Sequence, residues 1–125
     1  MPSPVFLGEF EQLVLLALLQ VSRELAEERR AGGSNEMVKD APVRPVRDRL
    51  GVLAGRSISR GALYRTLDRM EEKGWVEWRL DDADVPERGG HPRRHFRVTP
   101  EGIDVLRASR TTLLGMWSTL EEVLG

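Results

Sequence analysis

The sequence contains no cysteine, and this absence excludes several kinds of site at once. Without thiols the chain cannot form disulfides, use a thiolate as a nucleophile, or hold zinc or an iron–sulfur cluster through sulfur. Histidine is also scarce, since His91 and His95 lie in one basic segment without a third ligand of metal-site spacing. We therefore expect no metal, no other cofactor and no enzymatic activity.

Long hydrophobic runs are missing as well. The longest covers residues 13–19, whereas a membrane-spanning helix needs about 20 apolar residues. The first residues, MPSPVFLGEFE, lack the basic start of a secretory signal. Together with the lack of cysteine, these features predict a cytoplasmic protein that does not enter membranes. The length of 125 residues indicates one domain around a single core.

Basic and acidic residues are nearly equal in number, at 19 and 20. The formal net charge is −1, so the overall charge does not indicate a nucleic-acid partner. The distribution is more informative, because residues 43–73 contain eight basic and four acidic residues, and residues 88–97 contain four basic and none acidic. A basic segment is most often only solvated surface, but these two segments coincide with two parts of one structural motif.

That motif is a helix, a glycine stop and a two-stranded hairpin, as in a winged helix-turn-helix. Ser59 is suited to cap a helix over residues 60–73, and Gly74 is suited to end it. The apolar stripe of this helix is formed by Leu63, Leu67 and Met70. Strand alternation follows on both sides of the polar tip RGGHPRR, with the apolar positions at Val76, Trp78, Leu80, Phe96 and Val98.

Helices are predicted on both sides of this motif. Residues 7–30 form the first, which is apolar on nearly every side between residues 13 and 19 and highly charged in RELAEERR. A flexible loop over residues 31–40 follows. Residues 41–53 form a shorter helix, in which Pro42 and Pro45 must lie in the first turn. Thr99 caps the last helix, with Pro100 at its first position.

The last helix carries a seam with alternating spacings of three and four residues, as in a helix that packs along another helix. Its positions are Ile103, Leu106, Arg110, Leu113, Trp117, Leu120 and Leu124. The seam could pack on its own domain, but three other helices already cover the small core, so we expect a homodimer. The first helix would complete the dimer interface with Phe10, Leu13, Val14 and Ala17. Trp117 could instead line a pocket for a flat ligand, although packing is the commoner role.

Three segments resemble the PadR family of transcriptional regulators. LGEFEQLVLLALLQ resembles the family's first helix, SISRGALYRTLDRMEEKGWVEW its recognition helix and first wing strand, and ERGGHPRRHFRVTPEG its wing tip, second strand and capping turn. The sequence departs from the family in residues 21–39, which are longer than the usual link, and in Ala41-Pro42-Val43, where the family usually shows Ala-Tyr-Gly.

The resemblance implies a mainly α fold with a small antiparallel β-hairpin. Residues 1–99 would form the winged helix-turn-helix domain, with an extended first helix and the loop 31–40, and residues 100–125 the single C-terminal dimerisation helix of the family's short form. It also implies a dimeric repressor of palindromic operators in double-stranded DNA. Family members differ in whether a small-molecule effector relieves repression.

The predicted recognition helix and wing supply the candidate DNA contacts. The N-terminal part of a recognition helix lies against base edges, so the residues best placed to contact bases are Ser59, Arg60, Tyr64 and Arg65, with Arg69 nearer the backbone. Ser57 and Ser59 are suited to bind phosphate at the helix N-terminus. On the wing, the candidate contacts to phosphates or the minor groove are Arg88, Gly89, Gly90, His91, Arg93 and Arg94.

Some of these residues have a second interpretation. Tyr64 could have a packing role alone, with its ring on the preceding helix. Arg69 could have no role beyond surface charge pairs with Glu71 or Glu72. A winged helix can also serve as a protein-interaction module that does not bind DNA. Such a module would carry an acidic or apolar surface on residues 60–73, whereas this segment carries Arg60, Arg65, Arg69 and Lys73.

Overall fold

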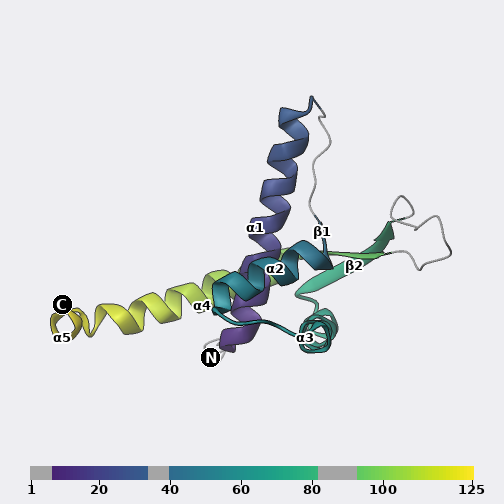
Figure 1. The fold of residues 1–125 in the computed structure, drawn as a ribbon. Coiled ribbons are helices and arrows are strands. Elements are labelled where there is room, and N and C mark those ends of the chain that lie inside the picture. The colour runs from purple at the N-terminus through teal and green to yellow at the C-terminus, as the bar shows by residue number, and fades with distance from the viewer. Residues whose placement is uncertain (1–6, 34–39, 82–92) are drawn as a thin grey trace.

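The computed structural model describes residues 7–33, 40–81 and 93–125, and their fold is mainly helical with a small antiparallel sheet. The elements are α1 (Glu9–Ala31), β1 (Ala41–Pro42), α2 (Val43–Ala54), α3 (Arg60–Glu72), β2 (Val76–Asp81), β3 (Arg93–Val98), α4 (Pro100–Ser118) and α5 (Glu121–Leu124). Figure 1 shows α1 crossing behind α2, with α3 and the sheet on one side and α4 leading away on the other. The predicted fold class is confirmed.

The sheet has the strand order β1-β3-β2, and both pairings are antiparallel. In the hairpin, Val76 is opposite Val98 and Trp78 is opposite Phe96, so the predicted alternation is correct. The prediction that a helix begins at Ala41 is wrong, because Ala41 pairs with Phe96 as a strand residue. A residue before proline is disfavoured in helical conformation, and Pro42 is itself extended at ψ 155°, so α2 begins only after it.

The ends of α3 are set by local chemistry, as predicted. The Ser59 hydroxyl accepts a hydrogen bond from the Ala62 amide at 3.1 Å. Gly74 follows the helix with φ +78°, a conformation that favours glycine. The predicted stripe is buried, and Thr66 joins it; the buried residues of α3 are Leu63, Thr66, Leu67 and Met70.

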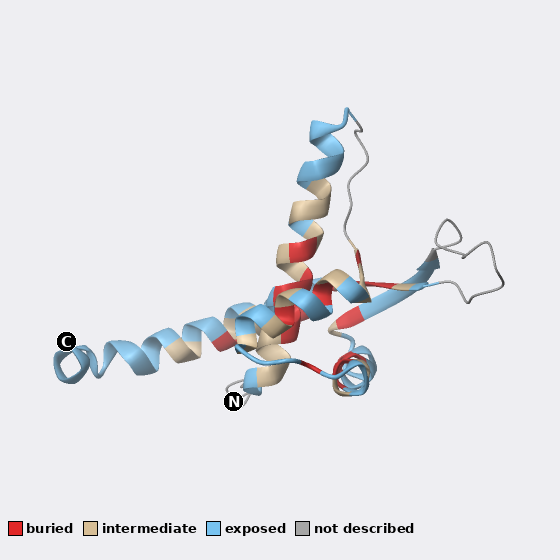
Figure 2. Ribbon diagram, viewed as in Figure 1, coloured by how far each residue is buried: buried red, intermediate tan, exposed pale blue. Residues whose placement is uncertain are grey.

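The core surrounds the first half of α1, where Leu15 and Leu18 lie with Phe96 of β3 in one buried cluster (Figure 2). The second half of α1 extends beyond this core and is largely exposed. Arg49 joins α2 to the middle of α1, since its guanidinium donates to Gln20 at 2.9 Å and to Glu24 at 2.7 Å. The first helix therefore serves as the central support of the domain and also reaches past it.

The start of α4 is held against the end of α3. Thr99 caps α4 by accepting from the Gly102 amide at 3.0 Å, and its hydroxyl donates to the Gly74 carbonyl at 2.6 Å. The prediction of one continuous helix to Leu124 is wrong, because α4 ends at Ser118. The hydroxyls of Ser118 and Thr119 donate to carbonyls three residues earlier, which competes with the helical hydrogen bonds.

Candidate nucleic-acid interface

A cleft of about 840 Å³ lies between α2, the turn that follows it, the first half of α3 and the start of β3. We call it the arginine cleft, because its lining includes Arg44, Arg47, Arg56, Arg60, Arg93 and Arg94. Among the described residues that line it, Asp48 is the one acidic residue. Such a concentration of positive charge in a concave surface favours polyanionic ligands.

The turn between α2 and α3 shapes this cleft. Gly55 adopts φ +68° after α2, and buried Ile58 anchors the turn to the core. The Arg47 Nε donates to the Ile58 carbonyl at 2.7 Å, so an α2 side chain fixes the entry to α3. On the far side of the turn, the guanidinium of Arg56 lies 6.0 Å from the ring centroid of Phe10 on α1.

A second structural feature, which we call the arginine–aromatic stack, consists of Arg60, Tyr64, Arg94 and Trp78. The guanidinium carbons of Arg60 and Arg94 lie 5.4 Å and 5.2 Å from the ring centroid of Tyr64. Arg94 also lies 4.8 Å from the Trp78 ring. The stack therefore runs from the N-terminus of α3 across β3 to β2, and each guanidinium–ring contact is of the cation–π type.

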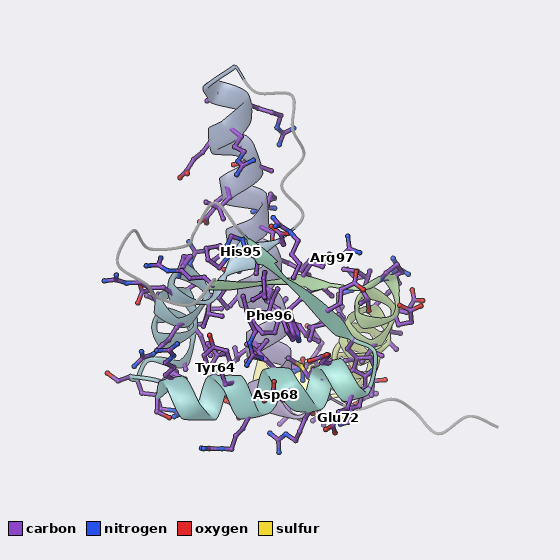
Figure 3. All side chains as sticks on the ribbon, turned by 90° about the vertical axis from the view of Figure 1, so that its right-hand side faces the viewer. Tyr64, Asp68, Glu72, His95, Phe96 and Arg97 are labelled. Carbon is purple, nitrogen blue, oxygen red and sulfur yellow. The ribbon has the colours of Figure 1, made fainter. Side chains whose placement is uncertain are left out.

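The Tyr64 ring has a fixed support beneath it. It meets the buried ring of Phe96 edge-on, with centroids 6.3 Å apart and an angle of 66° between the planes. Figure 3 shows Tyr64 and Asp68 on α3 with Phe96 above them on the sheet. The Tyr64 ring therefore packs against the sheet, a partner that the packing interpretation did not name.

The structure brings some of the predicted DNA contacts together and separates others. Ser57, Arg60, Tyr64, Arg93 and Arg94 all line the arginine cleft. The exposed side chains of Arg65 and Arg69 project from α3 outside the cleft lining, and Ser59 is occupied as the helix cap. Four predicted wing contacts lie outside the described residues: Arg88, Gly89, Gly90 and His91.

Three cleft residues did not stand out in the sequence: Arg44, Arg47 and Arg56. All three were counted among the eight basic residues of segment 43–73. That count does not show that they line the cleft while Arg49, in the same segment, does not. The spacing of Arg44 and Arg47, one helical turn apart at the start of α2, is the signal that could have found them.

An apolar groove of about 460 Å³ lies between α1 and α4, on a different surface. It contains five residues of the predicted seam, Ile103, Leu106, Arg110, Leu113 and Trp117, together with Gln12, Leu16, Leu19, Arg107 and Leu114, which the sequence did not indicate. The remaining seam residues, Leu120 and Leu124, are exposed at the C-terminal end of the chain.

The predicted interface residues of α1 fall into two groups. Phe10 and Leu13 are partly buried and pack against the core. Val14 and Ala17 have no exposed surface in the single chain, because both face the core. They therefore offer nothing for a second chain to contact, and the exposed Leu16 on the same helix replaces them as the candidate.

His95 is buried on β3, with its Nδ1 3.7 Å from a carboxylate oxygen of Asp40. Within residues 7–33, 40–81 and 93–125, no group of three or more His, Cys, Asp or Glu side chains is placed to hold a metal ion. None of the helices that the structure describes is both long and apolar enough to cross a membrane.

A helix-turn-helix followed by a β-hairpin, with arginines gathered where these parts meet, defines a winged-helix protein. The chain belongs to the transcriptional regulator PadR-like family, whose family model matches residues 45–108. It is therefore a transcriptional regulator. The matched segment covers α2 from its third residue, α3, the hairpin and the first half of α4.

Solved structures show the same fold. A PadR family transcription regulator from hypervirulent Clostridium difficile has 19% sequence identity and a TM-score of 0.62, covering 94% of this chain and 100% of that one. A PadR family regulator from Eggerthella lenta has 24% identity and a TM-score of 0.59, covering 90% and 81%. A PadR-like regulator from Bacillus cereus has 17% identity and a TM-score of 0.60, covering 91% and 89%. No curated protein matches the sequence.

Proposed function

We propose that this regulator is a cytoplasmic homodimer that binds palindromic operators in double-stranded DNA and represses transcription. The arginine cleft carries the proposal, because six arginines from α2, the turn, α3 and β3 converge on one concave surface beside the recognition helix. The backbone of DNA is a dense array of negative charge, and neutralising it releases counterions and favours binding.

In this proposal α3 enters the major groove. Arg60 and Arg65 contact base edges, where an arginine can donate two hydrogen bonds to one guanine. Ser57, Arg44 and Arg56 bind phosphates on one side of the groove. Arg93 binds a phosphate from the wing.

The dimer rests on the apolar surface of α4. The last two turns of this helix lie away from the domain, and Leu114 and Trp117 are 61% and 60% exposed (Figure 2). An exposed apolar surface that continues into a groove is typical of a protein interface, and a symmetric second copy would cover both. Residues 100–125 then form the dimerisation unit and residues 1–99 the DNA-binding unit. An effector that relieves repression would act by changing how the two units are placed.

The direct test is selection of genomic fragments by the purified chain. We expect enrichment of one palindromic sequence and a steep loss of binding as salt increases. A variant with Arg60 and Arg65 both changed to alanine should retain weak binding and lose the enrichment. If the wild-type chain enriches no sequence and its binding does not depend on salt, the protein is a winged-helix interaction module and the proposal is wrong.

A further inference from the structure

Arg94 contacts more side chains than any other arginine of the cleft does among the described residues. Its guanidinium lies over the rings of Tyr64 and Trp78, and its Nη1 is 3.5 Å from the Asp68 carboxylate. These partners come from α3 and β2, whereas Arg94 itself lies on β3. Only 37% of its side chain is exposed. The two rings and the carboxylate restrict the orientation of this guanidinium and offset part of its charge, so it gains less from a phosphate than an unrestrained arginine does.

Arg93 is the natural comparison. It is the adjacent residue on the same strand, so its side chain points to the opposite face of the sheet. It is exposed and lines the edge of the cleft. Its side chain forms no ion pair or ring contact within the part of the chain that the structure describes. The two neighbouring arginines therefore differ in their freedom, although the sequence presents them as equivalent.

The contacts of Arg94 lead to Arg60. Arg60 lies at the first position of α3, and its guanidinium lies against the same Tyr64 ring that Arg94 contacts. Tyr64 in turn is supported by the buried ring of Phe96. The orientation of Arg60 therefore depends on a ring whose position Arg94 helps to hold.

We propose that Arg94 is a positioning residue for base recognition, which holds Tyr64 and through it orients Arg60, and that it is not a phosphate contact. This inference rests on the proposed DNA-binding function and adds a specificity determinant to it. An arginine that is already oriented loses less conformational freedom when it binds a guanine, so the correct base pair is favoured more strongly. The affinity for random DNA does not depend on the orientation of Arg60, because a contact to a phosphate can be made in several orientations of the side chain.

The test compares base preferences of variants that retain the dimer and the fold. Sequence profiles are measured by selection from a randomised operator with the wild-type chain and with Arg60→Ala, Arg94→Ala and Arg93→Ala. We expect Arg60→Ala to remove the preference at one base pair in each half-site. Arg94→Ala should reduce the preference at the same base pair by about three- to tenfold, the range expected when a cation–π interaction is removed, and leave other positions unchanged. When Arg60→Ala is already present, adding Arg94→Ala should not change the preference at that base pair further.

Salt dependence separates the two arginines independently. Arg93→Ala should lower affinity for selected and random DNA by the same factor and reduce the salt slope by about one, because one phosphate is no longer neutralised. Arg94→Ala should leave the slope at the wild-type value. If Arg94→Ala instead behaves like Arg93→Ala, or changes a different base pair from Arg60→Ala, or changes nothing, the inference is wrong.

Trp78→Leu provides a variant that retains every arginine. It removes the second ring under Arg94, together with the hydrogen bond that Trp78 Nε1 donates to Glu71 at 2.8 Å, so a lower preference at the Arg60 base pair would not arise from the loss of an arginine. Leu53→Ala is the control, since Leu53 of α2 is 38% exposed, as Trp78 is, and belongs neither to the stack nor to the lining of the cleft. These variants also decide the question if Arg94→Ala fails to fold, as judged by thermal melting. If the wild-type chain selects no sequence at all, the proposed function fails and this inference fails with it.

Discussion

The backbone of Gly102 in α4 packs directly against the carbonyl group of Trp75. A Cβ at position 102 would overlap the Trp75 carbonyl oxygen and lie 2.7 Å from Cγ1 of Val98. The same carbonyl oxygen accepts a hydrogen bond from the Thr99 amide at 3.0 Å, so the oxygen cannot move without breaking that bond. This close approach fixes how α4 leaves the hairpin and α3.

Gly102→Ala should therefore destabilise the protein by about 1–3 kcal/mol, the usual cost of overpacking, because the Trp75 carbonyl group that occupies the space cannot rotate aside as the end of a long side chain can. Gly115→Ala is the matched control. It lies on the same helix with no atom near its Cβ position, and it should be neutral or stabilising by up to about 1 kcal/mol through helix propensity. Urea denaturation at one fixed protein concentration measures the free energy of unfolding of both variants. Equal stability of the two variants would contradict the packing argument.

Ser59→Ala should cost about 1 kcal/mol of unfolding free energy, because it removes the acceptor of the Ala62 amide hydrogen bond at the start of α3. Ser57→Ala should leave stability unchanged, since Ser57 is exposed and does not cap the helix. Thermal melting of both variants without DNA distinguishes the two hydroxyls. A similar loss in both would show that the turn as a whole, and not the cap, sets this stability.

Substitution of glutamate for Leu114 or Trp117 should convert the proposed dimer into a monomer, because a charge in an apolar interface must be desolvated without a partner. Sedimentation at micromolar concentration should then give a mass near 14.1 kDa, whereas the wild type should give twice that value. Val52→Glu is the control, since Val52 is 77% exposed but lies on α2, outside the apolar groove. A monomeric wild type would refute the dimer directly.

Arg65→Ala should weaken operator binding by about 1–3 kcal/mol while hardly changing binding to random DNA, because it removes hydrogen bonds to a base edge. Arg30→Ala removes the same charge from the exposed end of α1, far along the chain from the cleft, and should change neither. Titration of labelled operator and random duplexes at one salt concentration compares them. If Arg65→Ala reduces both affinities equally, Arg65 contacts the backbone.

Several features follow from neighbouring residues and were predictable for that reason. The caps Ser59 and Thr99 bond to amides three residues away, and Gly74 supplies a backbone conformation that its own lack of a side chain permits. The assignment of hairpin residues to one face follows from alternation on the two strands. The periodicity of apolar residues did not predict the strand at Ala41 or the end of α4 at Ser118. Ala41 pairs with Phe96 of a distant strand, and the Ser118 and Thr119 hydroxyls bond to carbonyls that a continuing helix would use.

Caps, glycine stops and apolar periodicity act over a few residues, so the winged fold, the basic recognition helix and the apolar last helix could be predicted from the sequence. Which arginines share a cleft, and which are already occupied, depends on how the elements pack. Arg93 and Arg94 are adjacent and chemically identical, yet only Arg94 lies beside Tyr64 and Asp68 of α3. That difference arises because strand alternation sends the two side chains to opposite faces and the fold places α3 against only one of them.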